Sequence, residues 1–325
     1  MQTVTDLDEP TQNDHVPPEG PAGTALAPIG RIFGYLIIWW IGMSIASSLV
    51  FPFVSDRKPT DLTFLAVVAI PNAMATILLT LAFVKYMDQR PVMTLGLSRQ
   101  GSWMAELGFG VLLGPALVGI VFLTALALGW VDITGSLFLR SPATIALALL
   151  QTLVVMAGIA VTEEVAVRGY ILQNLRDGYG AVAALVVSSL LFGVLHLMNP
   201  EADLSALGGT LAAGLILGYG YLATERLWLP IGFHFSWNFA LGPIFGFPVS
   251  GIDLPAWLMH NPSGPVVWTG GAFGPEAGVL GIIAMALGWL GIRYFRRLWY
   301  RPGQAALETG AESPDNKMQD ESRVA

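Results

Sequence analysis

The sequence predicts an all-α fold, a polytopic membrane bundle of about eight transmembrane helices, and three observations lead to that prediction. First, 54% of the 325 residues are hydrophobic and only 12% are charged, with a mean hydropathy of +0.62. Soluble domains carry about 25% charged residues. Second, apolar runs of about 20 residues, long enough to cross a bilayer core as a helix, recur along the chain. Third, Lys and Arg gather in alternate connections between these runs, as they do in multi-pass membrane proteins.

Each apolar run is one predicted span. The clear spans cover residues 32–53, 62–85, 107–130 and 144–167. Less uniform spans follow at residues 181–197, 206–222, 229–247 and 277–294. An even number of spans places both ends of the chain on the same side of the membrane.

The distribution of Lys and Arg gives the expected orientation. With these spans, eleven of the Lys and Arg residues between positions 31 and 301 lie on the side of the termini, and only Arg57, Lys58 and Arg140 lie on the other side. Cytoplasmic connections are enriched in these residues. We therefore expect an integral, multi-pass protein with both termini in the cytoplasm. Because the chain contains no cysteine and looks bacterial, we expect it in a bacterial plasma membrane.

The two ends of the chain differ in composition from the apolar middle. Residues 1–30 and 298–325 hold ten of the 23 acidic residues and are rich in polar and helix-breaking residues. Such segments bury little apolar surface, so we predict two disordered tails around a transmembrane domain at 31–297. Residues 248–276 combine Pro, Gly and aromatic residues and are interpreted as a re-entrant or interfacial segment. Nothing in the charge distribution indicates nucleic-acid binding.

A few ionisable or polar side chains interrupt the apolar spans. A charged side chain in a transmembrane segment costs at least about 2.5–3.5 kcal/mol to insert, so such residues are candidate functional residues. They fall in three spans: Glu163, Glu164 and Arg168 at the end of the fourth, His196 at the end of the fifth, and His234 with Asn238 in the seventh. Polar groups on three of the spans suggest one shared polar cavity. Because cysteine is absent, disulfides, thiolate metal sites and cysteine nucleophiles are excluded.

Helical spacing separates the two adjacent carboxylates. Glu164 and Arg168 stand four residues apart and can form an ion pair on one face, whereas Glu163 points about 100° away. Glu163 is therefore the carboxylate that is free to act as a general base. Phe192, four residues before His196, is expected to pack against the imidazole and orient it.

Each cluster also has a structural interpretation. The three charges of the fourth span could simply begin a cytoplasmic loop. His196 could cap its helix, and His234 with Asn238 could form hydrogen bonds between helices. The sequence VAVRGYILQNL, which stays in helical register to Leu175, weakens the first of these interpretations.

The predicted span boundaries create a conflict of depth. They put Glu163 at the cytoplasmic end of the fourth span and His196 near the outer end of the fifth. The two can meet if the fourth helix continues from about residue 143 to about 175, so that Glu163 lies well inside the membrane, and if the fifth helix enters deeply or tilts.

The three clusters, taken in order, resemble the motif set of the CPBP family of intramembrane proteases, which includes the type II CAAX prenyl endopeptidases and the Abi proteins. The motifs are the paired glutamates with Arg168, Phe192 with His196, and His234 with Asn238, and Gly169 and Tyr170 also fit the first of them. The resemblance covers about residues 140–245. It implies an eight-helix bundle with a catalytic chamber inside the membrane.

The resemblance also implies residue roles. Glu163 would activate a water molecule, His234 would orient it, and His196 with Asn238 would hydrogen-bond the oxyanion. Glu164, Arg168 and Phe192 would support the site. No cofactor is required in this interpretation. A zinc ion held by Glu163, His196 and His234 is a less favoured alternative, because it would consume the carboxylate that is best placed as the base.

Three functions are compatible with these residues. The favoured one is an intramembrane endopeptidase acting on a membrane-embedded or lipidated protein, with the bilayer as its other partner. The alternatives are a membrane scaffold or bacteriocin-immunity protein without proteolytic activity, and a proton-coupled transporter that uses the same residues as a relay. The complete set of polar residues disfavours the scaffold, and the lack of internal repeats disfavours the transporter.

Overall fold

The computed structural model describes residues 27–59, 61–136 and 141–299. The predicted tails therefore lie almost wholly outside the described residues. Helix α1 begins at Ala27 and helix α9 ends at Trp299, so both extend a few residues into the segments that were expected to be tails.

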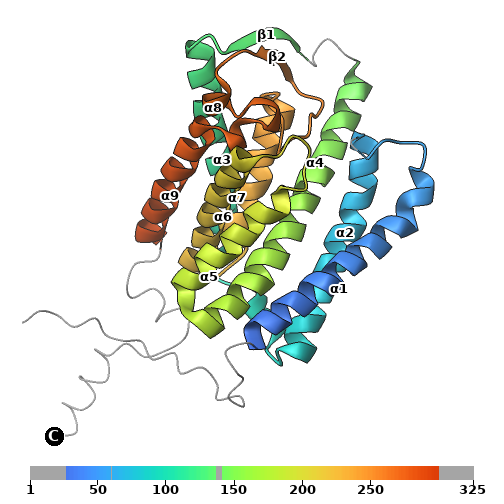
Figure 1. The fold of residues 1–325 in the computed structure, drawn as a ribbon, viewed down its shortest axis with the longest axis vertical. Helices are drawn as coiled ribbons and strands as arrows, with labels where there is room; N and C mark the ends of the chain where they lie inside the picture. Colours follow the sequence, from blue (N-terminus) through green and yellow to red (C-terminus); the bar gives the residue numbers. More distant parts are fainter. Residues whose placement is uncertain (1–26, 60, 137–140, 300–325) are drawn as a thin grey trace, which may run out of the picture.

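The described chain is a helical bundle (Figure 1). Its long helices are α1 (Ala27–Val50), α2 (Leu62–Ala82), α3 (Trp103–Ala127), α4 (Pro142–Glu164), α5 (Leu172–His196), α6 (Leu204–Thr224), α7 (Trp228–Phe239) and α9 (Val279–Trp299). Six helical stretches of the described residues are long and apolar enough to cross a membrane. The polytopic helical bundle is thereby confirmed. The number of eight crossings stays a prediction, because α4 and α5 belong to one helical stretch and α7 alone has only 12 residues.

The fourth helix continues past its predicted end at residue 167. α4 passes into a π-helical segment, Val165–Ile171, which leads directly into α5. The chain turns back only at Gly180, whose φ of 81° lies in the left-handed region that favours glycine. Every residue of the π-helical segment is buried, so interior packing carries the helix through the charged positions. Glu163 therefore lies well inside the bundle, and the return path after Gly180 brings His196 back toward it.

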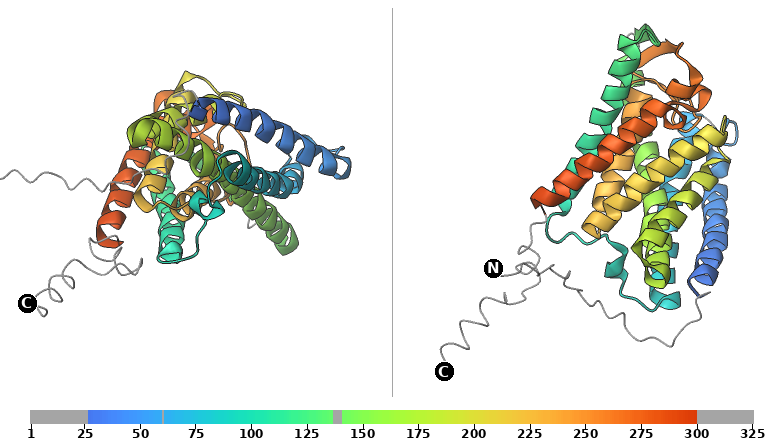
Figure 2. Two further views of the ribbon diagram at one scale, coloured as in Figure 1. Left: turned by 90° about the horizontal axis from the view of Figure 1, so that it is seen from below. Right: turned by 60° about the vertical axis from the view of Figure 1, so that its left-hand side comes forward.

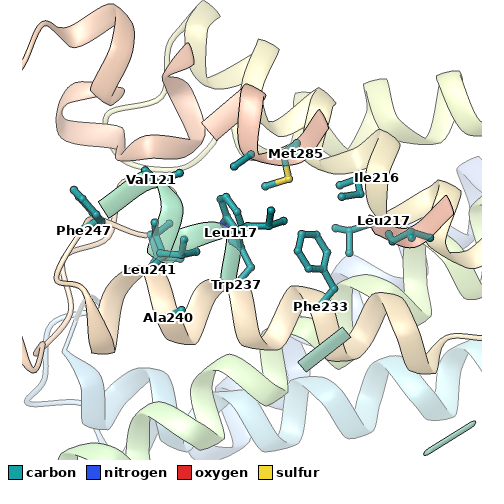
Figure 3. Packing of buried hydrophobic residues seen from close by; sticks show 14 of the residues in the cluster. Leu117, Val121, Ile216, Leu217, Phe233, Trp237, Ala240, Leu241, Phe247 and Met285 are labelled. Atoms are coloured by element: carbon teal, nitrogen blue, oxygen red, sulfur yellow. The ribbon is translucent and has the colours of Figure 1, made fainter. Parts of the chain in front are cut away.

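The helices form two packed groups (Figures 1 and 2). α3, α6, α7 and α9 surround one core cluster, in which Leu117, Phe233, Trp237 and Met285 interdigitate (Figure 3). α1 and α2 stand at the opposite edge of the bundle, and α4 and α5 lie between them and that first group. The α3 and α7 backbones approach so closely that a Cβ at Gly110 or Gly114 would collide with α7.

The two ends of the bundle differ in charge. Of the twelve Lys and Arg residues in the described part of the chain, nine lie at the end where α1 begins and α9 stops: Arg31, Lys85, Arg90, Arg99, Arg176, Arg226, Arg293, Arg296 and Arg297. Arg57 and Lys58 lie at the opposite end, and Arg168 is fully buried.

The connection between α7 and α9 covers that opposite end of the bundle (Figure 1). It contains strand β2 (Leu258–Pro262), which pairs antiparallel with β1 (Val131–Ser136), and the short helix α8 (Val266–Thr269). Two 3-10 turns follow, Gly271–Phe273 and Pro275–Ala277. The connection is therefore a folded cap on the bundle rather than an extended loop.

Candidate active site

A cavity of about 180 Å³ lies among α4, α5, α6 and α7, and the connection after α7 forms part of its wall. The residues from the three sequence clusters that line it are Glu163, Phe192, His196, His234 and Asn238. Glu164 and Arg168 lie behind the wall and are fully buried. The three clusters therefore meet, as one shared cavity requires.

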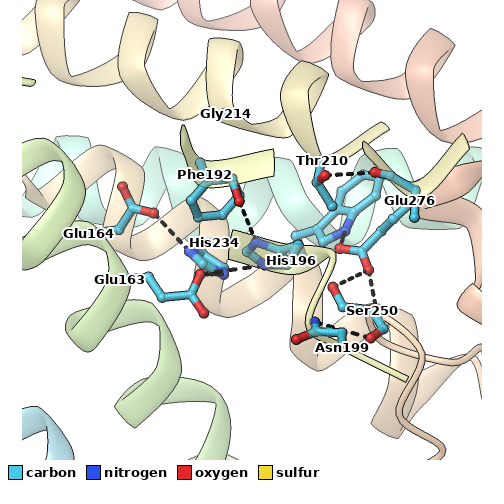
Figure 4. Close-up of polar contacts among 12 residues, drawn as sticks. Glu163, Glu164, Phe192, His196, Asn199, Thr210, Gly214, His234, Ser250 and Glu276 are labelled. Atoms are coloured by element: carbon cyan, nitrogen blue, oxygen red, sulfur yellow. Dashed lines mark hydrogen bonds and ion pairs between the residues drawn. The ribbon is translucent and has the colours of Figure 1, made fainter. Parts of the chain in front are cut away.

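Glu163 faces both histidines. Its Oε2 atom lies 3.8 Å from Nε2 of His196 and 3.8 Å from Nε2 of His234 (Figure 4). These distances are too long for direct hydrogen bonds, but one water molecule can bridge groups at this separation. Oε2 is buried and has no hydrogen-bond partner among the described residues. The carboxylate is thus available to a water or to a reacting group in the cavity.

Glu164 holds the site together from behind. Its Oε1 atom accepts a hydrogen bond from Arg168 Nη1 at 2.9 Å, the pairing that the four-residue spacing predicts, and another from His234 Nδ1 at 2.8 Å. Arg168 also donates from Nη2 to the backbone oxygen of Gly214 at 3.1 Å. The buried ion pair therefore connects α4 with α6 and α7. The bond from Glu164 to His234 spans 70 positions, so helical spacing could not predict it.

Phe192 lies between Arg168 and His196. Its ring centroid is 4.5 Å from the Arg168 guanidinium carbon, a cation–π contact, and 4.4 Å from the imidazole of His196. Its backbone oxygen accepts a hydrogen bond from His196 Nδ1 at 2.8 Å. The phenyl ring and the backbone carbonyl together fix the orientation of the imidazole.

The partners of the two histidines determine their tautomers. A backbone carbonyl only accepts hydrogen bonds, so Nδ1 of His196 carries a hydrogen, and the ionised Glu164 imposes the same state on Nδ1 of His234. In a neutral ring, Nε2 is then an acceptor. His196 can consequently donate from Nε2 to an oxyanion only when the ring carries both protons. The amide of Asn238 donates without that condition.

Sequence reasoning missed the polar residues at the far end of the cavity. Asn199, Thr210, Ser250 and Glu276 also line it. Glu276 is only 8% exposed and accepts hydrogen bonds from Trp237 and Ser250 (Figure 4). Two of these four residues, Ser250 and Glu276, come from the connection after α7, whose function the sequence left open. Glu276 is one of only two acids in residues 248–276, and that scarcity was the available signal.

The distances within the site do not match those of a bound zinc ion. Two ligands of a tetrahedral zinc ion lie about 3.4 Å apart when each bond is about 2.1 Å, but the carboxylate oxygen of Glu163 lies 3.8 Å from each histidine nitrogen. Among the described residues, no three His, Asp or Glu side chains form a group that could hold a metal ion. The Nδ1 partners are of the kind that metal-bound histidines also have, so the tautomers are compatible with a bound zinc ion. The argument against zinc comes from the distances alone.

The fold and the cavity define the class: a polytopic helical membrane protein in which a carboxylate and two histidines face one buried chamber. Residues 145–240 match the model of the Rce1-like family, described as type II CAAX prenyl endopeptidase Rce1-like. The chain thus carries an Rce1-like domain of the CPBP and CAAX protease family, which confirms the family resemblance. No curated protein and no solved structure matches the chain.

Proposed function

We propose that this protein is an intramembrane endopeptidase that hydrolyses a peptide bond in a membrane-associated substrate. The observation that supports this function best is the position of Glu163, whose unpaired Oε2 atom lies 3.8 Å from Nε2 of both His196 and His234 inside the cavity. The Rce1-like match supports a protease of the CAAX type.

In the proposed reaction, a water molecule occupies the space between Glu163 and the two histidines. Glu163 takes a proton from the water as its oxygen attacks the scissile carbonyl carbon, and His234, held by Glu164, orients that water. The carbonyl oxygen becomes an oxyanion that accepts hydrogen bonds from Asn238 and from doubly protonated His196. Glu163 then gives its proton to the leaving nitrogen, the C–N bond breaks, and an acid and an amine are released.

The size of the cavity limits what it can enclose. Its volume of about 180 Å³ is below the roughly 300–1,000 Å³ of typical ligand pockets. The cavity therefore has room for the reacting peptide group and its immediate neighbours. Part of the cavity wall is apolar, with Leu65, Ile159 and Leu254 among the lining residues. Any lipid chain on the substrate would stay outside the cavity, in the bilayer.

We also propose that the end of the bundle with nine basic residues faces the cytoplasm, in a bacterial plasma membrane. The chain would then begin and end on the cytoplasmic side. Attachment of a membrane-impermeant reagent to a cysteine placed at either end of the chain, in intact and in opened cells, tests this orientation.

The function is tested by comparing membrane proteomes of cells that produce the wild type, Glu163→Ala or His234→Ala. We expect one or more membrane proteins to be shortened only by the wild type, and purified wild type in proteoliposomes to cleave them. Glu201→Ala, which changes an exposed carboxylate on the α5–α6 connection, is the matched control and should cleave normally. If cells with Glu163→Ala and cells with His234→Ala show the same shortened membrane proteins as cells with the wild type, the protease proposal fails. The scaffold interpretation then takes its place.

A further inference from the structure

Glu276 occupies the far end of the cavity, in the 3-10 turn Pro275–Ala277 that leads into α9. Its carboxylate accepts three hydrogen bonds (Figure 4). Trp237 Nε1 donates to Oε1 at 3.2 Å, and both the backbone nitrogen and the hydroxyl of Ser250 donate to Oε2, at 2.6 and 2.8 Å. One buried carboxylate thus joins α7 to the connection that forms part of the cavity wall.

The turn that Glu276 holds is tightly constrained. Ser250 has a φ of 47° and Gly251 a φ of 84°, both in the left-handed region. A Cβ at position 251 would collide with the backbone oxygen of Pro200. The backbone oxygen of Ser250 accepts a hydrogen bond from Asn199 Nδ2 at 3.3 Å. Ser250 is therefore fixed between Glu276 on one side and the α5–α6 connection on the other.

The partners of this network stand beside residues of the proposed site. Trp237 directly precedes Asn238 on α7, and Asn199 follows His196 by three residues at the end of α5. The series Trp237, Glu276, Ser250 and Asn199 therefore links the two helices that carry the proposed oxyanion donors. A displacement of Ser250 would loosen both α7 near Asn238 and the end of α5 near His196.

We propose that Glu276 is a positioning residue of the active site, which fixes the far wall of the cavity and the spacing between Asn238 and His196. The importance of that spacing rests on the proposed function. The rigidity of the wall does not depend on the proposed function, and it can be measured without any cleavage assay.

Glutamine is an informative replacement because it keeps the shape of the side chain. Its amide has only one acceptor oxygen, so it cannot accept hydrogen bonds from Trp237 and Ser250 at opposite ends. One set of buried donors must lose its partner, which is costly inside a protein. Glu276→Gln should therefore increase the population in which the wall is open.

The absence of cysteine from the chain makes this population measurable. Thr210→Cys places a single thiol on the cavity wall, and Ala184→Cys places one in the separate core cluster around Tyr35 and Tyr170. In full-length protein in detergent, alkylation of Cys at position 210 by a charged maleimide should become about tenfold faster when Glu276→Gln is added. Alkylation at position 184 should not change, whereas general loosening of the fold would speed up both.

Asp253→Asn is the matched control, because Asp253 is the other acid of the same connection and is exposed. It should leave the alkylation rate at position 210 unchanged. Ser250→Ala and Trp237→Phe each remove one side-chain donor and should give smaller increases. These two variants also decide the matter if Glu276→Gln fails to fold. Equal rates in Asp253→Asn and in the variants of the network would overturn the proposal.

The effect on cleavage separates this inference from the function itself. If the wild type cleaves its substrate, Glu276→Gln should lower kcat more than it raises KM, because the oxyanion donors act in the transition state. Glu276→Asp, which keeps the charge, should restore part of the rate. If the wild type cleaves nothing while the alkylation rates differ as expected, the proposed function fails and the role of Glu276 in holding the wall stands.

Discussion

Buried polar side chains differ in their hydrogen bonding between the cavity and the contact of α1 with α2. Where α1 packs on α2, Tyr35 hydrogen-bonds Thr80 at 2.8 Å and Trp39 donates to Thr76 at 2.8 Å, so each buried polar group has a partner. In the cavity, Oε2 of Glu163 has none among the described residues. Native proteins pair nearly all buried polar atoms, and an exception calls for an explanation. The contrast supports the proposed role of Glu163 as the general base.

The same contrast separates two adjacent residues. Glu163 is 26% exposed to the cavity, whereas Glu164 is fully buried, with Arg168 and His234 as partners. We therefore predict that Glu163→Gln lowers the rate of substrate cleavage by about 10²–10⁴-fold and leaves the thermal unfolding temperature unchanged. Glu164→Gln should instead lower the unfolding temperature. Cleavage in proteoliposomes and circular dichroism on heating measure the two effects, and a reversed pattern would contradict the assignment of roles.

The next largest effect, a loss of stability, is expected from the buried ion pair between Glu164 and Arg168. Arg168→Met leaves the Glu164 carboxylate without its cation inside the protein, which should destabilise the fold by about 3–5 kcal/mol. Arg176→Met is the control, because Arg176 pairs with Glu225 in a partly exposed position and should contribute only about 0–1 kcal/mol. Unfolding titrations in mixed detergent give both values. Equal losses in the two variants would mean that burial adds nothing to the pair.

Substitution of Asn238 should lower the rate of the reaction and leave the fold unchanged. Asn238→Ala removes a proposed oxyanion donor and should reduce kcat by about 10²–10³-fold. Ser236→Ala, two residues earlier on α7, is the control: its hydroxyl donates to the backbone of Gly110 on α3 and does not line the cavity. A similar loss of kcat in both variants would indicate a general disturbance of α7.

A smaller effect is expected where α1 is attached. Tyr35→Phe removes the hydrogen bond to Thr80 and should cost about 1 kcal/mol of unfolding free energy. The rate of cleavage should stay at the wild-type value. Tyr294→Phe, at an exposed position on α9, should change neither quantity. A large loss of cleavage in Tyr35→Phe would show that α1 contributes to the reaction and does more than pack.

Metal removal is expected to have the smallest effect. Because the distances from Glu163 to the histidines exceed those of a tetrahedral zinc site, dialysis against a chelator should leave the cleavage rate unchanged. Elemental analysis of the purified protein accompanies the assay. Stoichiometric zinc whose removal abolishes cleavage would contradict the mechanism based on Glu163 alone.

The class of the fold and most of the candidate site residues could be predicted from the sequence. Apolar runs of membrane length predict helices because a bilayer offers the backbone no other hydrogen-bond partners. The charged residues within those runs are few enough to name one by one. Helical geometry then separated Glu163 from Glu164, because residues four apart share a face and adjacent residues do not.

The sequence did not predict how far α4 continues, where the chain turns back or what lies opposite each side chain, because these features depend on packing between helices. Burial of Val165–Ile171 carries the helix onward to Gly180, which resolves the conflict of depth between Glu163 and His196. The bond from Glu164 to His234 and the network around Glu276 join residues that are 26 to 70 positions apart. The spacing of residues along one helix cannot predict such contacts, because they depend on how whole helices pack.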